Sequence, residues 1–151
     1  MYGDTTVMRK RADQLREQGI DIAQTADQLV AQADGIDWTG RAAATMRARI
    51  HDRARHLREA ASSHESAADS MGRHVAEVDR LKDAISAAEH RASSLVQDAH
   101  TRVAQLEAHQ DPDGERRTPT EADRTLLAFV PPPPGHKDWL AVDLPGLNGS
   151  R

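Results

Sequence analysis

Apolar residues in the first third of the chain recur with the period of a packed helix. Between residues 5 and 36 the gaps alternate between four and three, which is the heptad pattern of a helix that packs along one stripe. Asp4 or Thr5 can serve as the N-cap. Because much of the stripe is alanine, we expect this helix to need a packing partner. Its members are Met8, Ala12, Leu15, Gly19, Ile22, Ala26, Leu29, Ala33 and Ile36.

A second, longer stripe predicts a helix over residues 40–109. The alternation of three and four continues for about 60 residues. One helix of this length would extend about 105 Å at 1.5 Å per residue, so the first helix can cover only half of it. The stripe consists of Met46, Ile50, Arg53, Leu57, Ala60, His64, Ala67, Met71, His74, Val78, Leu81, Ile85, Ala88, Ala92, Leu95, Ala99, Arg102 and Leu106.

Two architectures fit this second stripe. The helix can be continuous, with the half beyond Met71 projecting to pair with another chain. Alternatively it breaks within residues 62–72, at Ser62–Ser66 or Ser70–Gly72, and folds back as a three-helix bundle. Serine and glycine lower helix propensity only modestly, the segment has no proline, and the heptad phase is kept. We therefore predict the continuous helix.

The segment Gly35–Gly40 separates the two helical patterns. A short turn between two such helices predicts an antiparallel helical hairpin. Asp37 or Thr39 can cap the second helix, and Gly40 allows the two backbones to approach closely. The predicted fold is all-α and coiled-coil-like, with helices at about 5–34 and 40–109 and a turn at 35–40.

Residues 111–151 form a proline-rich tail after the hairpin of residues 1–110. Asp111–Gly114 ends the second helix. Thr118, Pro119 and Glu121 make a capping box and predict a short helix that ends near Phe129. Pro131–Pro134 predicts a polyproline II rod.

The end of the tail is more apolar than a linker, and its candidate motif consists of Trp139, Leu140 and Leu144. These residues can dock on the protein's own helices. They can also form a short linear motif that the proline rod presents to a partner. A disordered end is the third alternative.

Composition limits the function classes. Alanine dominates the apolar residues, and the chain has one Phe, one Tyr and two Trp. Burial of such small side chains contributes little, so we expect a thin bundle stabilised by a partner. The net charge of −4 argues against general nucleic-acid binding. The sequence shows neither a membrane span nor a classical signal peptide, so we expect a cytoplasmic protein or export by another route.

The chain offers little for catalysis. It has no cysteine, no phosphate-binding loop and no nucleophile elbow, so we predict no enzyme and no cofactor. The pairs His56/Glu59 and His74/Glu77 lie about 27 Å apart along a helix and cannot share an ion, so we predict no metal site. The basic face Arg41–Arg58 most simply complements the acidic first helix, and weak nucleic-acid binding is the alternative.

Four polar residues interrupt the long stripe. His64 and His74 are expected to flank the interface, with a pH-sensitive interface as the alternative. Arg53 and Arg102 are expected to set register and partner choice, as buried polar residues do in coiled coils.

The turn Trp38-Thr39-Gly40, followed by Arg41-Ala42-Ala43-Ala44, resembles the WXG100 (ESAT-6-like) family of type VII secretion systems. The resemblance covers about residues 1–90. It implies a hairpin that pairs, as a homodimer or heterodimer, into a four-helix bundle, with Trp38 packed at the hairpin end. The strong preference for arginine over lysine suggests a GC-rich genome and fits an actinobacterial setting for this family.

The resemblance implies a non-catalytic partner or substrate of a type VII (ESX-like) system. The family's export signal, Tyr-x-x-x-Asp/Glu after the second helix, is missing, because the single tyrosine is Tyr2. An accessory subunit whose WXG100-like partner or larger effector carries the signal fits this departure, and secreted substrate and cytosolic escort both remain open. A homodimeric coiled-coil protein unrelated to secretion is the alternative, and a weak nucleic-acid binder is the third hypothesis.

Overall fold

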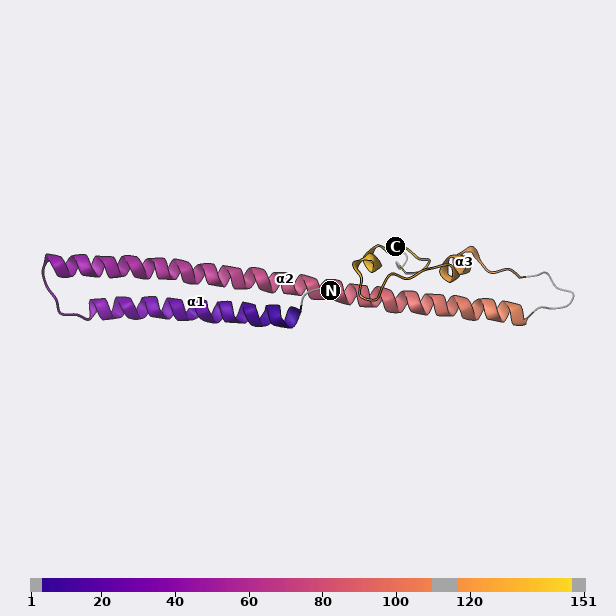
Figure 1. Cartoon of the computed structure of the whole chain (residues 1–151), viewed down its shortest axis with the longest axis horizontal. Helices are drawn as coiled ribbons and strands as arrows, with labels where there is room; N and C mark the ends of the chain where they lie inside the picture. Colours follow the sequence, from indigo (N-terminus) through magenta and orange to yellow (C-terminus); the bar gives the residue numbers. More distant parts are fainter. Residues whose placement is uncertain (1–3, 110–116, 148–151) are drawn as a thin grey trace. The chain divides into compact units, whose positions relative to one another are not determined.

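The computed structural model describes residues 4–109 and 117–147, and its described part is all-α (Figure 1). The elements are α1 (Thr5–Asp34), α2 (Arg41–Ala108), α3 (Glu121–Leu127) and the 3-10 helix η1 (Lys137–Ala141). The predicted helical hairpin with a long second helix and a short tail helix is confirmed. The predicted terminator Asp111–Gly114 lies outside the described residues.

Helix α2 is continuous, and Ser62–Ser66 and Ser70–Gly72 remain helical. The chain nevertheless divides into two compact units, Met1–Asp79 and Arg80–Arg151, here called the hairpin unit and the tail unit. The buried row of α2 changes heptad phase between them, although we inferred continuity from a preserved phase. A continuous helix can bury different rows along its length. Here α1 packs against the part of α2 in the hairpin unit, and the tail packs against the part in the tail unit.

In the hairpin unit, α1 runs antiparallel to the first part of α2 (Figure 1). The buried positions of α1 are seven residues apart and small: Thr5, Ala12, Gly19, Ala26 and Ala33. The corresponding row of α2 is Ala54, Ala61, Ala68 and Val75. Small residues at every seventh position let the two helix backbones lie close together.

At Gly19 the two helices approach a steric limit. A Cβ atom built there would lie 3.1 Å from the carbonyl oxygen of Ala61 and 3.4 Å from the Cβ of His64. A real side chain would have to push one helix away from the other. The spacing of the hairpin therefore depends on a missing side chain in the middle of α1.

Ion pairs join the helices along one edge of the hairpin unit. Arg16 lies 3.0 Å from Asp69 and Arg58 lies 2.6 Å from Asp27, while a hydrogen bond of 2.9 Å joins His51 to Asp34. Arg9 pairs with Asp79 near the start of α1. These side chains are between 32% and 69% exposed, so each pair contributes only about 0.2–1 kcal/mol. The predicted charge complementarity is therefore present within the hairpin, although among the described residues only His51 and Arg58 of the run Arg41–Arg58 pair with acidic side chains of α1.

The ends of the hairpin helices differ in part from the prediction. Asp4 is the N-cap of α1, since its carboxylate accepts from the amides of Thr6 and Val7 at 2.9 and 3.4 Å. Neither Asp37 nor Thr39 caps α2 among the hydrogen bonds of the described residues. Gly40 does not serve a close approach either, because a Cβ there would meet nothing within 4 Å. Its φ of 99° explains the glycine, since side chains disfavour that backbone conformation.

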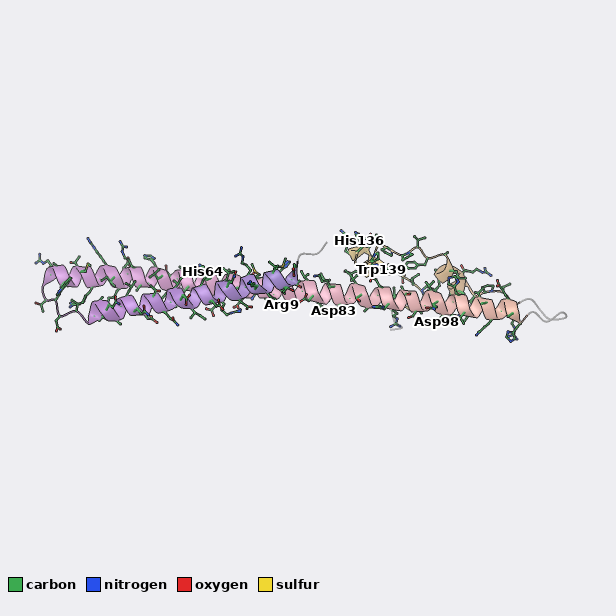
Figure 2. The ribbon with its side chains drawn as sticks, turned by 60° about the horizontal axis from the view of Figure 1, so that its bottom comes forward. Arg9, His64, Asp83, Asp98, His136 and Trp139 are labelled. Carbon is green, nitrogen blue, oxygen red and sulfur yellow. The ribbon has the colours of Figure 1, made fainter. Side chains whose placement is uncertain are left out.

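The tail unit builds its own core on α2, and Figure 2 labels Trp139 and His136 in this segment. The ring of Phe129 meets that of Trp139 edge-on at 6.1 Å, and the indole Nε1 donates to the Pro133 carbonyl at 3.1 Å. The tail therefore docks on the protein's own helix, as one of our three alternatives predicted. The buried core residues are Ile85, Ala92, Ala99, Leu126, Trp139, Leu144 and Leu147.

Polar contacts hold the tail to α2. The guanidinium of Arg102 donates to the buried carboxylate of Asp123 at 2.9 and 2.6 Å. Arg91 donates to the Gly146 carbonyl at 3.0 Å, and Glu89 accepts from the Gly135 amide. Arg102, predicted to set register with another chain, thus binds the chain's own tail.

The cap of α3 lies two residues later than predicted. The N-cap is Thr120 rather than Thr118, and its hydroxyl accepts from the Asp123 amide at 3.1 Å while donating to the carboxylate at 2.8 Å. Asp123, not Glu121, therefore completes the reciprocal cap. The hydrogen bond from Arg102, with help from Thr120, lowers the pKa of Asp123 below its ordinary 3.8.

We expect replacement of Gly19 by leucine to destabilise the hairpin by about 1–3 kcal/mol, the usual cost of overpacking. Gly72→Ala is the matched control, because a Cβ there meets nothing within 4 Å. It should raise stability by about 0.5–1 kcal/mol through helix propensity. Urea unfolding followed by circular dichroism compares the two variants. A neutral Gly19→Leu would contradict the close approach of the helices.

Docking of the tail should weaken in acid. Because the folded pKa of Asp123 is depressed, its contribution is fully present above the ordinary pKa of 3.8 and is lost as pH falls through the lower folded pKa. In a Trp38→Phe background, Trp139 is the only tryptophan, so its fluorescence between pH 6 and about 2 reports this docking. Adding Asp123→Asn should remove the acid-dependent step. An unchanged transition in that variant would assign the step to other carboxylates.

Candidate interaction surface

Within the hairpin unit, α2 carries two overlapping heptad stripes. They share one half-buried row, Ile50, Leu57, His64, Met71 and Val78. On one side of it lies the buried row that faces α1. On the other side lies an exposed row, Met46, Arg53, Ala60, Ala67 and His74. The shared and exposed rows together are called the outer stripe, of which the hairpin partly buries the shared row and leaves the other row exposed.

The exposed row of the outer stripe is the row that we wrongly predicted to face α1. We predicted Arg53, Ala60, Ala67 and His74 as the seam with α1, but the buried positions are one residue later, at Ala54, Ala61 and Ala68. Both rows are rich in alanine, so periodicity alone could not rank them. The error is informative, because it leaves a full heptad stripe on α2 beyond the one that α1 uses.

The remaining predicted interface residues of α1 lie on the same side of the hairpin. Met8, Leu15, Ile22 and Leu29 are half-buried and come three residues after members of the buried row. The interhelical ion pairs lie on the other side of that row. Among the described residues no large side chain is fully buried. The hairpin thus has one apolar face that its own two helices only partly cover.

The hairpin tip adds exposed apolar residues to this face. Trp38 is 59% exposed, Met46 49% and Ile36 39%. Trp38 therefore lies at the hairpin end, as the family resemblance implied, but most of its ring faces solvent. A hollow of about 80 Å³ opens here, lined by Ala33, Ile36, Trp38, Ala43, Met46, Arg47 and Ile50.

Arg47 fixes the tip through backbone atoms. Its guanidinium donates to the carbonyls of Ala33, Ile36 and Trp38 at 3.2, 2.7 and 2.7 Å. The end of α1 and the turn are therefore tied to the first turns of α2. Sequence reasoning placed Arg47 only in a basic run. The available signal was its position seven residues before Ala54, which puts it on the row that faces α1.

The other predicted site residues lie in the tail unit. Ile85, Trp139 and Leu144 are buried in its core, and Leu95 packs against that core. Leu81 is half-buried, and Leu140 is 49% exposed. The part of α2 that we expected to project toward another chain thus has its buried row covered by the tail.

The histidines form no shared site in the described part of the chain. His56 Nδ1 lies 3.2 Å from Glu59 and its Nε2 lies 3.6 Å from Asp52, on an exposed surface. No group of three His, Asp or Glu side chains among the described residues is placed to hold a metal ion. His64, labelled on α2 in Figure 2, has a buried Nδ1 without a hydrogen-bond partner. None of the described helices has an apolar stretch of the length that crosses a bilayer.

Comparison of the chain with family models, curated proteins and solved structures finds no match. The role of the outer stripe is therefore inferred from its own residues.

Arg47→Met should destabilise the hairpin by roughly 1–2 kcal/mol, because it removes charged hydrogen bonds but keeps most of the side-chain volume. Arg73→Met is the control, since Arg73 is an exposed position of the same helix. The midpoint of urea unfolding measures both. Equal midpoints for the two variants would mean that Arg47 does not hold the turn.

Proposed function

We propose that this chain is a non-catalytic helical partner protein that works by helix–helix pairing through the outer stripe. One observation carries the proposal: α2 has a second heptad stripe beside the one that α1 buries. A stripe of Ala60, Ala67 and the half-buried Leu57 and Met71 has the size and spacing that a facing helix packs against.

The energetics point the same way. Burial of apolar area is worth about 25 cal/mol per Å², and the alanine rows between α1 and α2 bury little. The larger apolar side chains of the hairpin are only partly buried. A partner that covers them stabilises the folded hairpin by mass action.

We place this pairing in type VII (ESX-like) secretion. The support is the motif Trp38-Thr39-Gly40 at the turn of a hairpin, together with a positive φ that explains the glycine. In that setting the chain acts as a partner of a WXG100-like protein or of a larger effector, or is itself a substrate of the system.

The competing functions draw less support. A homodimeric coiled-coil protein outside secretion would use the same stripe. Nucleic-acid binding through the face Arg41–Arg58 is disfavoured, because Arg47 binds carbonyls, Arg55 pairs with Asp52 and Arg58 pairs with Asp27.

Co-expression with the products of neighbouring genes tests the proposal. The wild-type chain should co-purify with a helical partner, and Ala67→Glu should abolish this by placing a charge in the outer stripe. Ser66→Glu is the matched control, because residue 66 is exposed but points away from the stripe.

Two results would count against the proposal. Equal capture by both glutamate variants would remove the outer stripe from the interaction. Failure to capture any neighbouring product, with no effect of the chain on type VII export, would remove the secretion setting.

A further inference from the structure

We propose that residues 130–134, here called the proline segment, are a docking site for a protein domain with an SH3-type groove. Such a groove is lined by aromatic rings and bears a carboxylate that takes a cation beside the prolines. The proline segment joins α3 to η1 in the tail unit. It shares no residue with the outer stripe, so the inference goes beyond the proposed helix pairing.

The proline segment has the restraints of a polyproline II rod. Proline fixes φ at about −65°, and a residue that precedes proline is held in the extended region. Because Pro131, Pro132 and Pro133 each precede another proline, both restraints act on all three. The segment belongs to no helix or strand. Its sequence therefore holds it in the conformation that aromatic-lined grooves bind.

Burial follows the three-residue period of such a rod. Phe129 and Pro132, three residues apart, are half-buried and form an inner row. The pairs Val130-Pro131 and Pro133-Pro134 make up the other two rows and are exposed. Val130 is 83% exposed, so its side chain contributes little to the tail core. The segment thus presents two Xaa-Pro pairs away from its own core, as a ligand with the spacing Pro-x-x-Pro does.

Contacts within the tail unit hold both ends of the proline segment. Before it, Phe129 packs against the tail core, and its amide donates to the Leu126 carbonyl at 3.3 Å. At its other end, the Pro133 carbonyl accepts from the His136 amide and from the Trp139 indole, each at 3.1 Å. A partner therefore binds a segment that is already ordered, which lowers the entropic cost of association.

The main chain of the proline segment can accept hydrogen bonds from a partner. Among the described residues, no hydrogen bond engages the carbonyls of Val130, Pro131 or Pro132. Tryptophan and tyrosine combine an aromatic face with a hydrogen-bond donor. A groove lined by these residues can pack on the prolines and donate to the carbonyls at the same time.

A flanking cation favours a groove that carries a carboxylate. Lys137, the first residue of η1, is exposed, and its ammonium group has no ion pair among the described residues. It follows Pro134 by three residues, as Pro134 follows Pro131. Charge-assisted contacts are stronger than neutral ones, so an acidic side chain at one end of the groove complements Lys137. This combination of aromatic pockets and an acid is the reason for the SH3-type assignment.

Titration calorimetry of the intact chain with a panel of SH3 domains, covering both orientations of bound ligand, tests the docking site. At least one domain should bind, and Pro131→Ala/Pro134→Ala should weaken that binding by roughly tenfold or more. Pro145→Ala is the matched control, because Pro145 is an exposed proline of the same tail outside the segment. Fluorescence of Trp139 in a Trp38→Phe background shows that each variant keeps the tail docked.

Charge reversal tests the class of groove. Lys137→Glu should weaken binding roughly tenfold, and the loss should shrink at high salt. Lys10→Glu, an exposed reversal in the hairpin unit, should leave binding unchanged. An effect of the proline variant without an effect of Lys137→Glu would overturn the SH3-type groove in favour of one without a carboxylate.

The outcomes are independent of the proposed function. Ala67→Glu should bind the panel like the wild type, and Pro131→Ala/Pro134→Ala should still capture the helical partner. Absence of binding by every domain of the panel would overturn the docking site. Equal binding by the wild type and the double proline variant would do the same.

Discussion

The hairpin depends on the close approach of two helices through a row of small side chains. At Gly19 the Ala61 carbonyl occupies the space that a side chain would need. Alanines occupy most of the other seventh positions in the buried rows of both helices. Dispersion contacts between the backbones can then replace some of the burial that larger residues would supply.

This way of packing has a cost that shapes the rest of the hairpin unit. Helices separated only by alanine cannot enclose leucine or methionine between them, so these residues lie along the margin. On one margin the ion pairs of Arg16 and Arg58 border the contact. On the other, Leu15, Leu57 and Met71 remain half-covered. Tight internal packing and an unfinished apolar face are therefore two results of the same choice of residues.

The sequence predicted the hairpin and the bounds of both helices, because heptad spacing and turn residues are local signals, and it left docking of the tail as one of three alternatives. It did not predict which of two alanine rows on α2 faces α1. Ala60 and Ala61 are chemically identical, and only the register with Gly19 distinguishes them. Arg47 and Asp123 were missed for a related reason. Each forms hydrogen bonds with residues distant in sequence. From the sequence, Arg47 was explained equally well as a member of an arginine run, and Glu121 served equally well as the capping residue in place of Asp123.

Arg47 holds the tip by contacts with main-chain oxygens only. The side chains of Ile36, Asp37 and Trp38 play no part in these three bonds. The backbone conformation of the turn therefore does not depend on which side chains the turn exposes. The turn side chains can therefore change in evolution without loss of the turn's shape, because one cation, two turns into α2, holds the backbone.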